Sequence, residues 1–172
     1  MLRKAEIEEA ARFPYHFADQ AIIPAAPAEL FAYLDKHAQL SAHMTRRSWM
    51  MGGGRMDIST DEGDFRQRGS RLRLAGRAFG FALFLEEEIT DYRPPLVKVW
   101  QIIGMPRLLI IGRYRMGFEI SPEAQGSSLR IFLDYELPTG TLSRLLGRWL
   151  SPMYARWCVR NMIAEGQKAF PG

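Results

Sequence analysis

Apolar residues recur at intervals of three and four in the stretch from Thr139 to Phe170, which places them on one side of a helix. They are Leu142, Leu146, Trp149, Leu150, Met153, Trp157, Met162 and Ile163. Four arginines between them, Arg144, Arg148, Arg156 and Arg160, predict a basic and solvated opposite face. We therefore expect a long amphipathic helix over Thr141 to Phe170 that packs on an apolar surface.

A proline interrupts this predicted helix. Proline removes one backbone hydrogen bond and costs about 3 kcal/mol inside a helix. Pro152 therefore predicts a kink or a split, and Gly147 is expected to soften the turn before it.

From Arg46 to Leu137 the apolar pattern changes to strict alternation, which is typical of strands. Clusters of Gly, Pro, Asp and Ser break this region into six segments. The predicted strands are Ser48 to Ile58, Phe65 to Leu74, Phe79 to Tyr92, Val97 to Ile103, Leu108 to Ile120 and Leu129 to Leu137. With an earlier strand at Tyr15 to Ile23, the short connections predict a seven-stranded antiparallel sheet.

Alternation assigns a face to each predicted side chain, because successive residues of a strand point to opposite sides. The inward set is Leu72, Leu74, Tyr114, Met116, Phe118, Ile120, Leu129, Ile131, Leu133, Tyr135 and Leu137. Arg71, Arg113 and Arg130 represent the outward set. The C-terminal helix is the element long enough to cover the inward face.

Two short helices are predicted between the first two strands. Pro27 suits a first helical turn, and Leu30, Phe31 and Leu34 form an apolar stripe, while Leu40 and Met44 predict the second helix. Residues 1–14 are expected to be a helical extension of a single domain over residues 15–172.

Composition narrows the class of protein. The chain has 172 residues, of which 47% are hydrophobic and 24% charged, as is ordinary for one globular domain. The net charge of +4 is concentrated after Pro138, so the basic helix indicates an anionic partner or membrane surface, or simply a solvated face. Nucleic acid is not an expected partner. One cysteine, no signal peptide and no spanning segment predict a cytoplasmic protein.

The order of strand, two short helices, six strands and long helix resembles the helix-grip fold of the START-related SRPBCC superfamily. That superfamily includes polyketide cyclases, lipid-transfer domains and plant allergens. The matching segments are IIPAAPAELFAYLDKHAQL, EEITDYRPP leading into LVKVW, RLLIIGRYRMGFEI and YARWCVRNM. The resemblance implies an α+β protein with a hydrophobic ligand cavity between sheet and terminal helix. It carries over no catalytic residue and implies no cofactor.

One carboxylate on the inward face is a candidate for chemistry. Glu87 shares its parity with Phe81, Leu83 and Leu85, so it should point inward, where a carboxylate must be paired, hydrogen-bonded or protonated. Gln101, Tyr114 and Tyr135 are the candidate partners. Glu87 with Tyr114 or Tyr135 could act as general acid and base; alternatively, Glu87 lies at a solvated rim.

The expected ligand-contacting residues come from the inward face and the terminal helix. They are Leu72, Leu74, Phe81, Leu83, Leu85, Gln101, Tyr114, Met116, Phe118, Leu133, Tyr135, Leu146, Leu150, Met153, Tyr154 and Trp157. Trp49, Trp100 and Trp149 could join them, although inward aromatic residues are more often plain core. The three histidines lack metal-ligand spacing, and Cys158 is expected to be a buried thiol, so no metal is expected.

Three functions remain open from the sequence. The chain could carry or sense a hydrophobic small molecule such as a lipid, a quinone or a polyketide-like aromatic. It could be an enzyme of the cyclase or dehydratase kind. It could also be a module whose basic terminal helix docks on a protein or an anionic membrane, which requires an exposed apolar strip on that helix.

Overall fold

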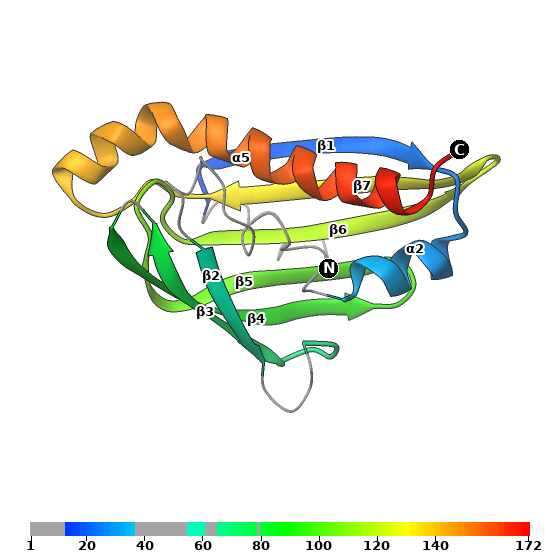
Figure 1. Ribbon diagram of the computed structural model, residues 1–172, viewed down its shortest axis with the longest axis horizontal. Helices are drawn as coiled ribbons and strands as arrows, with labels where there is room; N and C mark the ends of the chain where they lie inside the picture. Colours follow the sequence, from blue (N-terminus) through cyan, green and yellow to red (C-terminus); the bar gives the residue numbers. More distant parts are fainter. Residues whose placement is uncertain (1–12, 37–54, 61–64, 79) are drawn as a thin grey trace, which may run out of the picture.

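The computed structural model describes residues 13–36, 55–60, 65–78 and 80–172. Helix α2 follows the first strand, and the long helix α5 follows the last strand (Figure 1). They are β1 (Tyr15–Ile23), α2 (Pro27–Leu34), β2 (Arg55–Thr60), β3 (Arg71–Ala78), β4 (Phe81–Arg93), β5 (Val97–Arg107), β6 (Tyr114–Glu123), β7 (Gly126–Tyr135) and α5 (Thr141–Ala169). The predicted N-terminal helix and second short helix lie outside the described residues.

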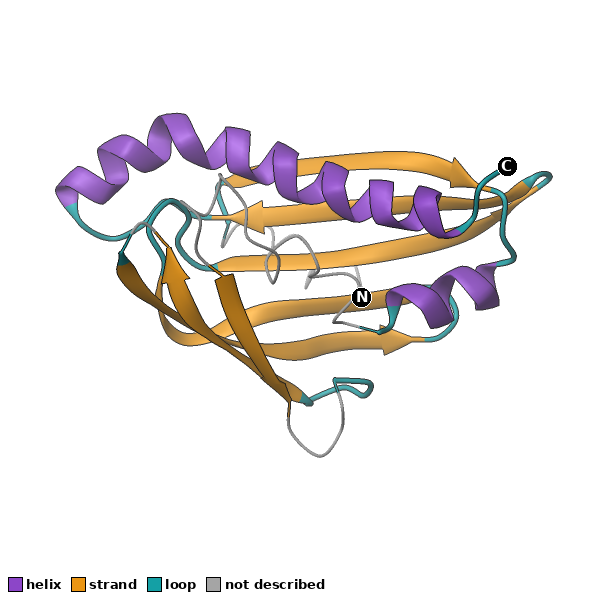
Figure 2. Cartoon of the chain, viewed as in Figure 1, coloured by secondary structure: helices purple, strands orange, loops and turns teal. Residues whose placement is uncertain are grey.

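The strands form one open antiparallel sheet in the order β1-β7-β6-β5-β4-β3-β2. Helix α5 runs across one face of this sheet, and α2 covers the same face beside the C-terminal end of α5 (Figure 2). The sheet therefore has an inner face beneath the helices and an outer face exposed to solvent. This arrangement confirms the predicted α+β class, with an antiparallel sheet and a C-terminal helix.

The alternation of the strands sets the inner face as expected. Leu72, Leu83, Phe118 and Leu133 are all buried in one core cluster beneath α5, and Arg71 is exposed. Arg113 and Arg130 were expected to be exposed, but both are half-buried. The Arg130 guanidinium lies over the ring of the outer-face residue Phe132, 5.6 Å from its centroid, which shields part of the side chain.

Most strand boundaries differ from the prediction; β5, for example, continues to Arg107 through the break predicted after Ile103. At three strand starts, backbone conformation and packing interrupt the alternation. Phe65 is buried but adopts a positive φ of 56° in the segment before β3, which no strand residue can do. Strand β4 begins at Phe81, two residues after its predicted start. Residues 108–113 precede β6 as an irregular segment, and Ile110 accepts a hydrogen bond there from the Ser151 hydroxyl of α5.

Helix α2 is built as the sequence predicts. Pro27 occupies its first turn, and Leu30, Phe31 and Leu34 are buried. The Phe31 ring packs edge-on against Phe118 of the sheet, with centroids 5.4 Å apart. This contact holds α2 against the inner face.

Helix α5 is one continuous helix with Pro152 inside it, so of the two predicted alternatives the split is wrong and the kink stays a prediction. Its buried side in the first half consists of small residues, Gly147, Ser151 and Ala155. A Cβ added at Gly147 would lie 2.8 Å from Cδ of Pro138 and 3.0 Å from the Ile110 carbonyl oxygen. The helix therefore approaches the chain beneath it too closely for a large side chain on that side.

This close approach turns the larger apolar residues outward. Leu146, Trp149 and Met153, which were expected to be buried, are 51%, 79% and 46% exposed. The first turns of α5 also extend past the ends of β1 and β7 (Figure 1). Among the α5 side chains that the structure describes, the large apolar residues that are buried lie in the second half, and Met162 and Ile163 are two of them.

Candidate functional site

A buried carboxyl and a buried phenol meet on the inner face of the sheet. Glu87 points inward from β4, as predicted, and is 2% exposed. The Tyr114 hydroxyl reaches from β6 across β5 and donates a hydrogen bond to Glu87 Oε1. The chain therefore holds a hydrogen-bonded acid inside a mostly apolar face.

The surroundings of Glu87 decide its protonation. Burial raises the pKa of Glu87 from its ordinary 4.5 to about 7, because the charged form loses its hydration. Hydrogen bonds from Tyr114 and Trp100 and the positive charge of Lys98 act in the opposite direction and lower this pKa. Glu87 can consequently exchange a proton near neutral pH.

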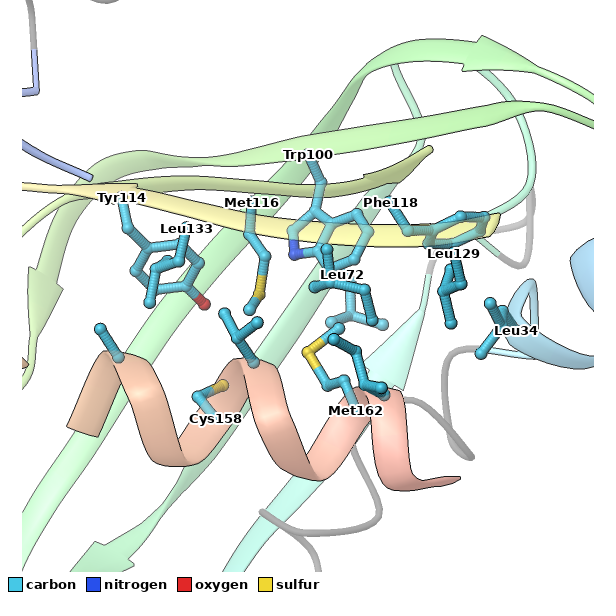
Figure 3. Packing of buried hydrophobic residues seen from close by; sticks show 14 of the residues in the cluster. Leu34, Leu72, Trp100, Tyr114, Met116, Phe118, Leu129, Leu133, Cys158 and Met162 are labelled. Carbon is cyan, nitrogen blue, oxygen red and sulfur yellow. The ribbon is translucent and has the colours of Figure 1, made fainter. Parts of the chain in front are cut away.

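Helix α5 contributes two further titratable groups to the same cluster. Burial and the Glu87 charge raise the pKa of the Cys158 thiol to about 12 and raise the pKa of Tyr154 well above its ordinary value. The Cys158 thiol is therefore protonated at neutral pH and is not a nucleophile. Figure 3 shows Cys158 on α5 facing Tyr114, Leu133 and Met116 of the sheet.

Most of the predicted ligand-contacting residues converge on this inner face. Those buried in the core are Leu72, Leu74, Leu83, Leu85, Tyr114, Met116, Phe118, Leu133 and Tyr135. Tyr154 and Trp157 are partly buried and pack against that core, with their ring centroids 5.8 Å apart. Leu150 is half-buried.

Several predicted site residues lie elsewhere. Gln101 is on the outer face, because its neighbours in the sheet register, Glu88 and Arg115, both point outward. Phe81 is 62% exposed at the start of β4. Tyr135 lies on the inner face but stacks on Tyr15 with ring centroids 5.4 Å apart, and the tyrosine that donates a hydrogen bond to Glu87 is Tyr114.

Leu146 and Met153 also lie apart from this face, since they project from the outer side of α5. Trp149 projects with them, whereas Trp100 is buried in the core. Trp49 lies outside the described residues.

The sequence analysis missed a buried ion pair beside this cluster. Lys98 is fully buried, and its ammonium donates hydrogen bonds to Asp35 Oδ1 and to the Phe65 carbonyl oxygen, both at 2.8 Å. Asp35 Oδ2 accepts a further hydrogen bond of 3.0 Å from Tyr92. Lys98 is two residues before the buried Trp100 on β5, so both side chains point to the same face. This alternation could have shown that Lys98 points inward.

A shallow groove of about 530 Å³ runs along the exposed side of α5. Its lining combines aromatic, apolar and basic side chains: Trp149, Pro152, Met153, Arg156, Trp157, Arg160 and Asn161. All of its lining residues belong to α5, and Glu87 is not among them.

Within the described ranges, no cluster of three or more His, Cys, Asp or Glu side chains could hold a metal ion. The described helices also include none that is both long and apolar enough to cross a membrane.

Comparison with solved structures identifies the fold. No family sequence model matches the chain, and no curated protein matches it. The di-domain ARO/CYC StfQ from the steffimycin biosynthetic pathway superposes with a TM-score of 0.65 at 15% identity, over 96% of this chain and 53% of StfQ. This chain thus spans about half the length of StfQ.

Two further structures match over nearly their whole length. The protein TTHA0849 from Thermus thermophilus gives a TM-score of 0.63 at 16% identity, covering 90% of this chain and 95% of that one. The major latex-like protein 151 from Panax ginseng gives 0.55 at 14% identity, covering 87% and 94%. The chain therefore has the helix-grip fold that its sequence resemblance implied.

Proposed function

We propose that the protein binds a hydrophobic small molecule between the inner face of the sheet and α5, with Glu87 and Tyr114 as its polar contacts. The observation that carries this proposal is the buried Glu87–Tyr114 hydrogen bond. A buried carboxyl with a raised pKa costs stability, and such groups cluster at functional sites. The similarity to StfQ and to the latex-like protein supports the proposal at the level of fold.

The side chains around the pair indicate the chemistry of the ligand. Met116, Leu133 and Cys158 offer apolar and polarizable surface, while the Glu87 carboxyl and the Tyr114 hydroxyl can each bond one polar group. A ring-bearing molecule with a hydroxyl or carbonyl group fits this combination. Ligands of this class would bury their rings and hydrogen-bond their oxygen to Glu87 or Tyr114.

Methionine methyl groups provide a direct test. Met116 and Met162 are buried on the two sides of the proposed site, whereas Met105 is 80% exposed. In a methyl-labelled sample titrated with 2-naphthol, the Met116 and Met162 resonances should shift together and saturate, and Met105 should not move. Uniform small shifts, or shifts confined to exposed methionines, would overturn the proposed site.

A variant pair tests the polar contact. Glu87→Gln keeps the shape but removes the charge, so 2-naphthol should bind about fivefold more weakly, in line with the greater strength of charge-assisted hydrogen bonds. Glu88→Gln is the control, because Glu88 is the next residue on β4 and pairs with Arg71 on the outer face. Equal affinities of the two variants would contradict a role for Glu87.

A second candidate function is catalysis of the cyclase or dehydratase kind. It is favoured by one observation, namely that the pKa of Glu87 is about 7, since a general acid or base works best near the ambient pH. Glu87 would take or give a proton at the ligand, and Tyr114 would donate a hydrogen bond to a developing oxyanion. For an enzyme, the turnover rate should change with pH around a pKa near 7, and Glu87→Gln should lose both this pH dependence and the activity. A carrier should show no turnover at any pH.

A further inference from the structure

Helix α5 carries apolar side chains that no packing inside the described structure requires. Leu145, Leu146, Trp149 and Met153 are 62%, 51%, 79% and 46% exposed; we call these four residues the α5 strip. They follow one another at helical spacing, so they lie on one side of the helix. Contiguous exposed apolar residues of this kind mark binding surfaces.

The charge around the α5 strip is of one sign. Residues 141–160 contain four arginines, Arg144, Arg148, Arg156 and Arg160, and no acidic residue. Arg160 pairs with Asp19 of β1 at 3.3 Å, whereas Arg144 and Arg148 form no ion pair with the residues that the structure describes. A partner that covers this side should therefore be negatively charged.

The position of the α5 strip favours a lipid layer over a protein. The α5 strip lies on a single helix, and the start of α5 extends past the ends of β1 and β7 (Figure 1). A helix in this position can enter the interfacial region of a bilayer while the sheet stays in water. Tryptophan suits that region because its ring is amphipathic, and arginine side chains can extend to the phosphates above it.

We infer that the first half of α5 is a docking surface for anionic phospholipid membranes, with the α5 strip inserted and Arg144, Arg148 and Arg156 bound to lipid phosphates. This inference does not rest on the proposed ligand site, because it uses the outer side of the helix. It gives the exposed side chains of Trp149 and Met153 a function.

Vesicle sedimentation tests the inference with the intact protein. Vesicles of pure phosphatidylcholine are compared with vesicles containing 30% phosphatidylglycerol, at low and high NaCl. Binding should require phosphatidylglycerol and should weaken as salt is raised, because salt screens exposed charges. Equal binding to both vesicle types, or binding to neither, would overturn the inference.

Two pairs of variants locate the surface. Trp149→Ala should lower the partition coefficient about tenfold through lost apolar contact, whereas Phe81→Ala, at another exposed ring on β4, should leave it unchanged. Arg148→Gln should lower it about fivefold, from about 1 kcal/mol per basic residue near an anionic surface. Arg68→Gln is its control, since Arg68 is exposed in the segment before β3.

Light scattering on the same samples distinguishes a protein partner. If the protein ignores vesicles but forms dimers that Trp149→Ala dissociates, the α5 strip is an interface between copies of the chain and the membrane inference is wrong. If all four variants bind vesicles like the wild type, the docking surface is not on α5 and the inference is equally wrong.

Discussion

The Tyr114 hydroxyl of β6 donates a hydrogen bond across β5 to the Glu87 carboxyl of β4, and both side chains are buried. The two residues are 27 positions apart in sequence, and strand alternation places them on the same face. Their meeting gives an apolar sheet face one acid whose pKa is near 7. This pair, and the way α5 and α2 are held over it, determine how the protein should respond to pH and to substitution.

Replacing the Glu87 carboxyl should remove a pH dependence of stability. Because burial raises the pKa from 4.5 to about 7, the folded state binds more protons than the unfolded state between these values. Wild-type stability should therefore fall as pH rises from 4.5 through the folded pKa of about 7, by about 2–3 kcal/mol between pH 5 and pH 8 relative to Glu87→Gln. Urea unfolding at pH 5 and pH 8 measures this difference.

Glu88→Gln is the control for this experiment, since Glu88 is half-buried on the outer face and pairs with Arg71. Parallel stability changes with pH in wild type and Glu87→Gln would mean that the carboxyl is solvated in solution.

Removing one partner of the Lys98–Asp35 ion pair should strongly lower the free energy of unfolding. Asp35→Ala leaves the fully buried ammonium without its carboxylate and should destabilise the protein by about 3–5 kcal/mol. Adding Lys98→Met should recover most of that loss, because the unpaired buried ammonium is then gone. Asp19→Ala, which removes the exposed partner of Arg160, should cost less than about 1 kcal/mol.

Chemical denaturation of these three variants provides the comparison. A double variant no more stable than Asp35→Ala would show that Lys98 stays hydrated in the single variant.

The two helical glycines of α5 should respond oppositely to alanine. Glycine to alanine in a helix normally gains about 1 kcal/mol from propensity. At Gly147 the new Cβ would lie 2.8 Å from the Pro138 ring and 3.0 Å from a backbone oxygen, so Gly147→Ala should lower the melting temperature. At Gly166 the nearest atom is Cδ2 of the flexible Leu129 side chain at 3.3 Å, so Gly166→Ala should be neutral or stabilising.

Calorimetry of both variants measures this contrast. A rise in melting temperature for Gly147→Ala would show that α5 does not approach residues 108–113 and Pro138 as closely as these distances imply.

The sheet could be predicted from the sequence because alternation is a local signal that buried strands obey. It placed Glu87, Leu72 and Leu133 on the inner face. It failed for Gln101, whose parity on β5 is opposite to that of the buried Trp100. Lys98 was not assigned to the inner face, because lysine is rarely buried unless it is paired. Its partner, Asp35, is 63 positions away in the sequence, so the pairing leaves no local signal.

The orientation of α5 could not be predicted from hydrophobicity. A helix with apolar residues at spacing three and four is expected to bury the largest of them. Here the close approach of Gly147 to Pro138 and Ile110 selects the small residues for the buried side, so Trp149 turns outward. That contact joins residues distant in sequence, and periodicity carries no information about it.

Native mass spectrometry of freshly purified protein tests the central claim most directly. If the inner face binds a hydrophobic molecule, wild type should carry a bound compound of a few hundred daltons that is extracted into organic solvent. Tyr114→Phe, which loses the hydroxyl but keeps the ring, should retain less of it, while Tyr15→Phe should match wild type. A wild-type spectrum at the bare chain mass, together with no saturable shift of Met116 by 2-naphthol, would contradict the account.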